Sequence, residues 1–342
     1  MGEAIYDGSE SIITKAMLIP YKDYPDVNET SQKLLAALRG EDTPQLHTKA
    51  RYWHGYLTVV KPLLLITSYQ NIRILNLIIE AVLAWMLSLL LFRKIGWGAS
   101  ASWLITWLFI NPVSASFCME YAIMYYISTI ATILLLSGFV SNKNLPYYFL
   151  LIGIVTAFFD FLTYPLLGLI LPLTVWLLLE IHHSQAWPKN CLIYSFFWLL
   201  GYAGMWAEKW ILSTILTDQN VIADAISTIR FRSSRTAYDQ RISYWEVIEK
   251  NLNVLGNIPL VLFSAFVIVG FVIIFIRYYK KQIRKNELLT FLLLTVSPFI
   301  WYFVLQNHSA IHYWFTYRTL SAFIIPFFNC VLLPLNEHRK DG

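Results

Sequence analysis

The sequence predicts an all-α fold, a polytopic membrane bundle of about nine transmembrane helices with juxtamembrane helices on its outward face. Of its 342 residues, 57% are hydrophobic and 14% are charged, whereas soluble domains carry roughly 25% charged residues. Long apolar runs recur along the whole chain, and basic residues gather in alternate connections between them. Composition and pattern together exclude an ordinary soluble domain.

Several apolar runs are long enough to span or nearly span a bilayer core, which takes about 20 helical residues. We expect spans at 72–92, 98–114, 118–140, 146–160, 163–179, 190–207, 257–276, 288–305 and 319–335. The stretch 146–179 would measure about 50 Å as one helix, so it must turn. The segment from Asp160 to Pro165 is its only polar and proline-bearing part, and a re-entrant pair of short helices is the alternative.

The connections between the runs predict the orientation. Arginine and lysine cluster in the short connections near positions 93, 143, 189, 277–285 and 339, while the alternate short connections hold only Arg318. Cytoplasmic loops carry the excess of basic residues. We therefore expect a protein of the bacterial inner (plasma) membrane whose first set of connections lies on the cytoplasmic side. The segments 1–71, 208–256 and 306–318 would then face outward, together with Asp160.

Residues 1–71 form a predicted extracytoplasmic first loop, and the bundle follows over 72–342 with the outer loop 208–256. Apolar and aromatic residues recur at helical spacing in four stretches of the first loop, 9–18, 31–38, 50–57 and 59–65. We expect short helices there, lying along the membrane interface. No apolar helix or signal peptide precedes the loop, so we expect that an initial transmembrane helix is missing; export of the charged tail itself is the alternative.

Carboxylates on the outward side are candidate functional groups. Asp160 lies in an almost wholly apolar hairpin, where a carboxylate usually faces a protein-lined, watered cavity. Asp7 and Glu10 stand just after the point where the missing helix would end, and ordinary solvated acids are the alternative for both. Glu120 opens a stripe of polar and tyrosine side chains at the outer end of the third span.

Arginines cluster in the outer loop, at Arg230, Arg232, Arg235 and Arg241. Guanidinium groups match phosphate oxygens in a bidentate fork, so this cluster suits a lipid phosphate or pyrophosphate. Ion pairing with Asp224 and Asp239 of the same loop is an equal alternative.

The connection 306–318 is dense in aromatic and hydrogen-bonding side chains. A helix there would place His308 and His312 on one face, with Arg318 further along, as a contact face for a sugar or phosphate; an aromatic interface belt is the alternative. Two histidines at this spacing can bind zinc, but the glutamate of the HExxH motif is absent. We predict no metal site, and no motif implies a cofactor, which leaves a divalent cation open.

These features together resemble the membrane glycosyltransferases of the GT-C superfamily, which take a sugar from a polyprenyl-phosphate carrier on the outer face. The resemblance is architectural, covers most of the chain, and rests on the outward cavity, the early acidic pair and the outer arginines. The segments Ala50–Tyr56, Phe158–Pro165 and Asn307–Arg318 are also similar to those of uncharacterised bacterial membrane proteins of this type. The missing first helix is the main departure from the pattern.

The resemblance implies transfer of the sugar with inversion at its anomeric carbon. Glu10 or Asp7 would be the general base. Arg235 and Arg318 would stabilise the departing polyprenyl phosphate, and Asp160 would bind sugar hydroxyls or hold an arginine. Expected partners are the lipid-linked donor, membrane lipid and a glycan, lipid or protein acceptor, with no nucleic acid. An O-antigen-type polymerase or ligase, and a transporter or flippase of lipid-linked sugar, are the alternatives.

Overall fold

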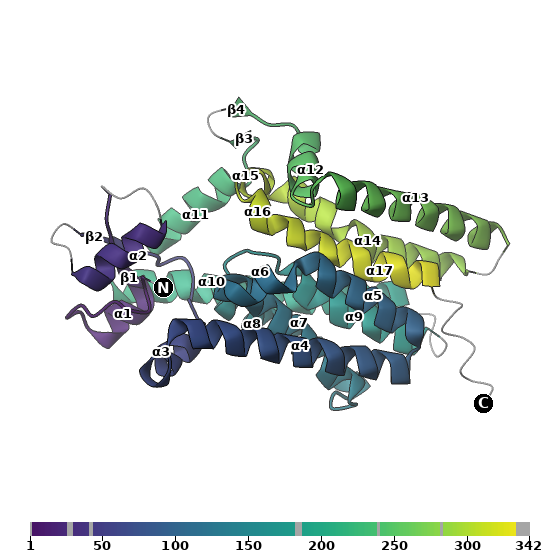
Figure 1. Ribbon diagram of the computed structural model, residues 1–342, viewed down its shortest axis with the longest axis horizontal. Helices are drawn as coiled ribbons and strands as arrows, with labels where there is room; N and C mark the ends of the chain where they lie inside the picture. The colour runs from purple at the N-terminus through teal and green to yellow at the C-terminus, as the bar shows by residue number, and fades with distance from the viewer. Residues whose placement is uncertain are drawn as a thin grey trace.

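The structure, a computed structural model, describes residues 2–25, 30–40, 44–181, 187–237, 240–280 and 283–332, and it is nearly all helical. Figure 1 shows the long helices side by side along the longest dimension of the molecule, with the small elements of the N-terminal segment together at one end. An all-α fold is therefore confirmed in its main outline.

The N-terminal segment contains short elements around one small sheet. They are α1 (Ile12–Leu18), β1 (Pro20–Asp23), α2 (Thr30–Arg39), β2 (Gln45–Thr48) and α3 (Leu57–Ile66). The strands pair antiparallel, and α1 begins where the Ser11 hydroxyl accepts the Thr14 backbone N–H, as an N-cap should. Helices at 9–18, 31–38 and 59–65 are thus confirmed, with small differences in their ends.

The predicted helix over 50–57 is wrong, because the chain forms a loop there until Leu57. His54 has a left-handed backbone with φ of 52°, and the Gly55 N–H donates to the Phe158 carbonyl oxygen at 2.9 Å. A Cβ on Gly55 would lie 2.4 Å from the Phe158 ring. Only glycine permits this close approach, which fixes the loop on the end of a bundle helix.

The bundle begins with the first half of the long helices. They are α4 (Tyr69–Lys94), α5 (Trp97–Ile110), α6 (Pro112–Phe117), α7 (Met119–Leu136), η1 (Asn142–Asn144), α8 (Leu145–Phe159), α9 (Leu166–Glu180) and α10 (Trp187–Leu216). The predicted turn between Asp160 and Pro165 is confirmed, since α8 ends just before it and α9 begins just after it. The run 98–114 breaks at Asn111, which has a left-handed φ of 61° and caps α6.

The rest of the chain alternates short and long elements. They are α11 (Val221–Arg232), β3 (Thr236–Ala237), β4 (Gln240–Arg241), α12 (Tyr244–Asn253), α13 (Asn257–Tyr279), α14 (Lys285–Val304), α15 (Gln306–Ile311), α16 (Tyr313–Thr316), η2 (Tyr317–Leu320) and α17 (Ser321–Leu332). The strands β3 and β4 form a small hairpin. The end of the last predicted span, at 333–335, lies outside the described residues.

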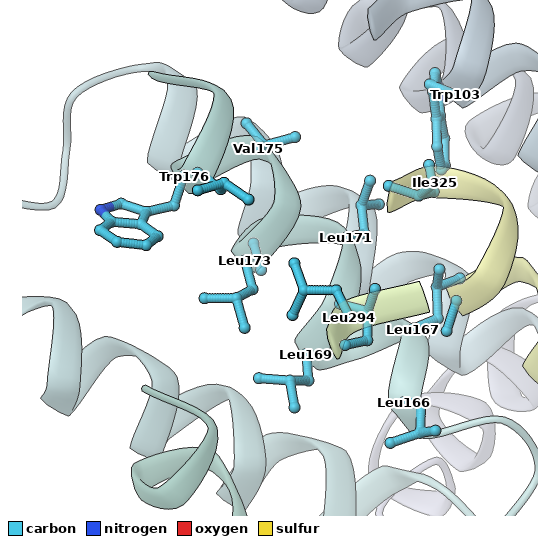
Figure 2. Close-up of a cluster of buried hydrophobic side chains, with 14 of the residues drawn as sticks. Trp103, Leu166, Leu167, Leu169, Leu171, Leu173, Val175, Trp176, Leu294 and Ile325 are labelled. Carbon is cyan, nitrogen blue, oxygen red and sulfur yellow. The ribbon is translucent and has the colours of Figure 1, made fainter. Parts of the chain in front are cut away.

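The core of the bundle surrounds α9. Residues 166–178 of this helix are all buried, and Figure 2 shows its leucines meeting Trp103 of α5, Leu294 of α14 and Ile325 of α17. A helix that is apolar on every face is stable only when its neighbours enclose it. The central position of α9 therefore follows from its uniformly apolar sequence.

The helices α8 and α10 pack unusually closely. A Cβ on Gly153 would lie 2.1 Å from the Trp198 carbonyl oxygen, and a Cβ on Gly201 would lie 2.2 Å from the Leu150 carbonyl oxygen. Small residues at a helix interface let two backbones approach each other in this way.

Five helical segments of the described chain are long and apolar enough to cross a membrane, namely α4, α7, α13, α14 and Tyr313–Leu332. They indicate a membrane-embedded protein. The helices α8 and α9 have 15 residues each and measure about 22 Å, less than the roughly 30 Å of a hydrocarbon core. The nine predicted spans are therefore not confirmed as a set.

Candidate functional site

A cavity of about 450 Å³, here called the polar cavity, lies at the end of the bundle that holds the N-terminal segment. Its wall takes residues from the N-terminal segment, the start of α7, the turn before α9, the end of α11 and the segment 308–315. This wall takes residues from each predicted outward segment, 1–71, 208–256 and 306–318, and from the turn after Asp160. This agreement supports the predicted alternation of the helices.

Two glutamates with different surroundings line the polar cavity. Glu3 has 6% exposure, and it accepts hydrogen bonds from the Lys49 ammonium and, at 3.3 Å, from the Tyr56 hydroxyl. Burial alone would raise the pKa of Glu3, but the charges of Lys49 and the chain's amino terminus, together with hydrogen bonds to the carboxylate, outweigh burial and lower the pKa to about 2. Glu120 is half-buried, and it has no hydrogen bond or ion pair within the described chain.

Arg232 brings a half-buried positive charge to the cavity. Its Nη1 lies 2.5 Å from Nε2 of His312, and it forms no ion pair with any described carboxylate. Burial lowers the pKa of Arg232, although an arginine stays protonated in proteins. A neutral histidine does not compensate a guanidinium charge, so this corner of the cavity favours an anion.

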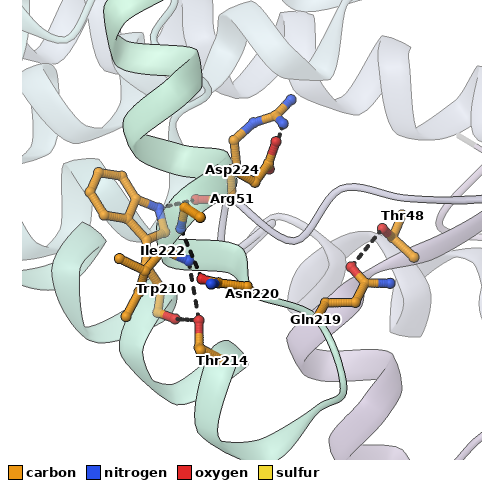
Figure 3. Close-up of polar contacts among 9 residues, drawn as sticks. Thr48, Arg51, Trp210, Thr214, Gln219, Asn220, Ile222 and Asp224 are labelled. Carbon is orange, nitrogen blue, oxygen red and sulfur yellow. Dashed lines mark hydrogen bonds and ion pairs between the residues drawn. The ribbon is translucent and has the colours of Figure 1, made fainter.

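Arg51 adds a second guanidinium to the cavity wall, but it is paired. Its Nη1 donates to Asp224 Oδ2 at 2.7 Å, and its carbonyl oxygen accepts the Trp210 indole N–H at 3.0 Å. Figure 3 shows these contacts joining the loop after β2 to α10 and α11. The Trp53 indole N–H also donates to the Met205 carbonyl oxygen, so the loop is held on α10 at two points.

Aromatic rings form one side of the cavity around Phe161. The ring centroids of His54, Tyr56 and Tyr52 lie 4.7, 5.3 and 5.7 Å from that of Phe161. Burial lowers the pKa of His54 to about 3 and raises the pKa of Tyr56, so both side chains are neutral near pH 7. Such a set offers apolar ring faces together with hydroxyl and imidazole groups.

The two histidines predicted to share a face do so. The rings of His308 and His312 lie 4.9 Å apart, and both line the cavity. His308 Nε2 donates to the Leu162 carbonyl oxygen at 2.9 Å, because a carbonyl oxygen can only accept. Burial lowers the pKa of His308 to about 3 and that of His312 to about 4.

Asp160 does not line the cavity, although a carboxylate in this hairpin was expected to face one. It has 1% exposure and accepts from the Thr163 backbone N–H at 3.1 Å and from the Thr163 hydroxyl. The turn that it holds places Phe161 in the cavity wall and gives Leu162 a left-handed φ of 67°. Its carboxylate therefore stabilises the turn that carries Phe161 and does not itself line the cavity.

A second space, here called the apolar groove, has a volume of about 400 Å³ and runs between α7, α8 and α3. Its lining is almost entirely aliphatic and aromatic, with Ile127, Leu151 and Val155 along its length. Tyr56, Val60 and Met119 line both the groove and the polar cavity. The two spaces therefore share a wall and adjoin each other.

The predicted acids of the N-terminal segment lie away from the cavity. The Asp7 side chain is 80% exposed and pairs with Lys22 at 3.2 Å. Glu10 accepts from the Tyr6 hydroxyl at 2.5 Å, which lowers its pKa. Glu3 takes the place in the cavity that these two acids were expected to fill.

The predicted arginines also separate. Arg230 is exposed on α11, while Arg235 and Arg241 line a different pocket beside the β3–β4 hairpin. Arg318 is buried, donating to the Ile110 carbonyl oxygen at 2.8 Å and to Ser114 Oγ at 3.0 Å. The expected pairing of Asp224 within its own loop is replaced by its pair with Arg51, and Asp239 lies outside the described residues.

Several cavity residues were not singled out from the sequence as site residues, above all Glu3, Lys49, Arg51, Tyr52 and His54. The run Ala50–Leu57 already showed the unusual density of aromatic and basic side chains that marks this part of the wall.

Among the residues that the structure describes, no group of three or more His, Cys, Asp or Glu side chains could hold a metal ion. No protein-family model, curated protein or solved structure matches this chain.

Proposed function

We propose that this protein is a membrane glycosyltransferase that moves a sugar from a polyprenyl-phosphate carrier to a cell-envelope acceptor. The observation that carries the proposal is the shared wall between the polar cavity and the apolar groove, formed by Tyr56, Val60 and Met119. A lipid-linked sugar has the same two parts, a charged and hydroxylated head and a long apolar chain. Burial of that chain contributes about 0.8 kcal/mol per methylene.

The charges of the cavity support the binding of a phosphate within it. Arg232 has no carboxylate partner among the described residues, and its neighbour His312 is neutral at pH 7. A charge-assisted hydrogen bond to phosphate would be favourable here. Arg51 can add a second donor, because its Nε is buried without a hydrogen-bond partner while Nη1 stays on Asp224.

The ring cluster around Phe161 supports a sugar as the head group. Its aromatic faces match the C–H face of a pyranose, and the neighbouring Tyr52 hydroxyl and His54 ring offer groups for the sugar hydroxyls. In this proposal Phe161 is the platform of the sugar, and Asp160 holds the platform in position through the turn.

The proposal includes an orientation. Nine helices would cross the inner membrane, with α8, α9 and α5 as short spans, and the polar cavity would face the extracytoplasmic side. The meeting of the N-terminal segment, Phe161, Arg232 and His308 in one cavity supports this alternation. Nucleotide sugars are scarce outside the cytoplasm, so a lipid-linked donor suits a site on that face.

Donor cleavage tests the proposal. Purified protein in proteoliposomes would receive radiolabelled polyprenyl-phosphate glucose, galactose or mannose, with a cell-envelope extract as the source of acceptor. We expect release of polyprenyl phosphate and label in a new product for one of these donors. A transporter would move the donor intact across the bilayer, and that result, or no cleavage of any donor, would contradict the proposal.

A further inference from the structure

Glu120 lines the polar cavity and is next in sequence to a residue of the shared wall. It belongs to the first turn of α7, directly after Met119, which lines both spaces. Its side chain lines the polar cavity, is half-buried, and has no hydrogen-bond or ion-pair partner in the part of the chain that the structure describes. A carboxylate in this setting is free to accept a hydrogen bond from a bound molecule.

The other carboxylate of the cavity is already engaged. Glu3 Oε1 accepts from the Lys49 ammonium, and Oε2 accepts from the Tyr56 hydroxyl. A general base needs a lone pair directed at the proton that it removes. Because its two oxygens are committed to protein donors, Glu3 is suited to holding Lys49 and Tyr56 in place.

The position of Glu120 corresponds to the reacting bond of the proposed donor. When the carrier chain occupies the groove, the phosphate follows at the shared wall, and the anomeric carbon lies one oxygen beyond the phosphorus. Glu120, which lines the cavity that would hold the sugar, is a carboxylate within this space, whereas Asp7 and Glu10 do not line it. We infer that Glu120 is the catalytic base that removes the proton of the acceptor hydroxyl, an inference that rests on the proposed function.

The step balances without a further reactant. The acceptor oxygen forms a bond to the anomeric carbon as its proton passes to the Glu120 carboxylate. The bond from that carbon to the phosphate oxygen breaks, and its electron pair leaves with the polyprenyl phosphate. Arg232 faces the negative charge that the leaving group gains, and Glu120 returns its proton to water.

Substitution of Glu120 by its amide tests the assignment. The variants Glu120→Gln and Glu120→Asp are compared with Glu3→Gln, with Glu10→Gln as the rival base, and with Glu208→Gln, an exposed acid on α10, as the matched control. Single-turnover transfer from the active polyprenyl-phosphate hexose is measured across a pH series. Retention of the labelled donor by the purified variant is measured separately, so that binding and chemistry are distinguished.

We expect Glu120→Gln to slow transfer about a hundredfold or more, as loss of a general base does, while donor retention stays unchanged. Its rate should lose the acidic limb of the wild-type pH profile, and Glu120→Asp should keep part of the rate. The assignment is overturned if Glu120→Gln transfers at near wild-type rate, if it loses donor retention in parallel, or if Glu10→Gln alone removes the acidic limb. Wild-type protein that cleaves no donor contradicts the proposed function itself, which separates the two failures.

Discussion

Arg232 and His312 meet in the polar cavity with their nitrogen atoms 2.5 Å apart. The guanidinium must be the donor, so His312 accepts through Nε2 and carries its hydrogen on Nδ1. Arg232 belongs to the end of α11 and His312 follows α15. The contact joins an outer-loop arginine to the 306–318 connection, the regions that the sequence suggested as contacts for a phosphate and for a sugar or phosphate.

Replacing Arg232 by glutamine should weaken donor binding. A charge-assisted hydrogen bond contributes about 1.5–3 kcal/mol, so we expect the KM for a polyprenyl-phosphate donor to rise roughly tenfold or more. Arg230→Gln is the matched control, because Arg230 is exposed on the same helix and lines none of the described pockets. Equal kinetics for the two variants would remove the phosphate role of Arg232.

Filling the apolar groove should discriminate between carriers of different length. Val155 lines the groove, and Val155→Trp should lower retention of a long-chain donor at least about fivefold, since it displaces several buried methylenes. A donor on a two-isoprene carrier should lose much less. Val82→Trp provides the control, because Val82 is an exposed residue of α4 away from the groove. Equal losses for both carriers would show that the chain binds elsewhere.

Asp160→Ala should destabilise the protein by about 1–3 kcal/mol, because the buried N–H and hydroxyl of Thr163 would lose their acceptor. The expected readout is a lower unfolding temperature in detergent. Asp7→Ala, at an exposed carboxylate, should leave that temperature unchanged. A stable Asp160→Ala variant with no activity would instead indicate direct contact with the substrate.

Acidification should destabilise the site through His54. Burial lowers the pKa of this ring from 6.5 to about 3, so the unfolded chain binds the proton more tightly. The stabilising contribution is complete above pH 6.5 and is lost as the pH falls toward 3, with about 2 kcal/mol lost at pH 5. His54→Phe can keep the contact with Phe161, and its unfolding temperature should depend less on pH between 7 and 5.

The helices were predictable because their signals are local. Apolar length and the turn at Asp160 each depend on a few neighbouring residues, and the structure has helices over the apolar runs and a turn at Asp160. The break at Asn111 was missed, because an asparagine in an otherwise apolar run does not by itself show a left-handed backbone.

The cavity residues were harder to predict, because they depend on contacts between distant segments. Glu3, Asp7 and Glu10 lie within eight residues of one another, yet only Glu3 meets Lys49, from further along the first loop. Arg318 resembled a phosphate ligand, but the free carbonyl at the end of α5 takes its guanidinium instead. Such choices are made by tertiary packing.

The glycine contact between α8 and α10 connects two parts of the site. With Gly153 and Gly201 against opposing carbonyl groups, α8 is fixed to α10, and Lys209 of α10 donates to the Ala16 and Met17 carbonyl oxygens of α1. One wall of the groove, α8, and the helix α1 of the N-terminal segment are thus both attached to α10. A displacement of α10 would therefore shift the groove wall and the N-terminal segment together.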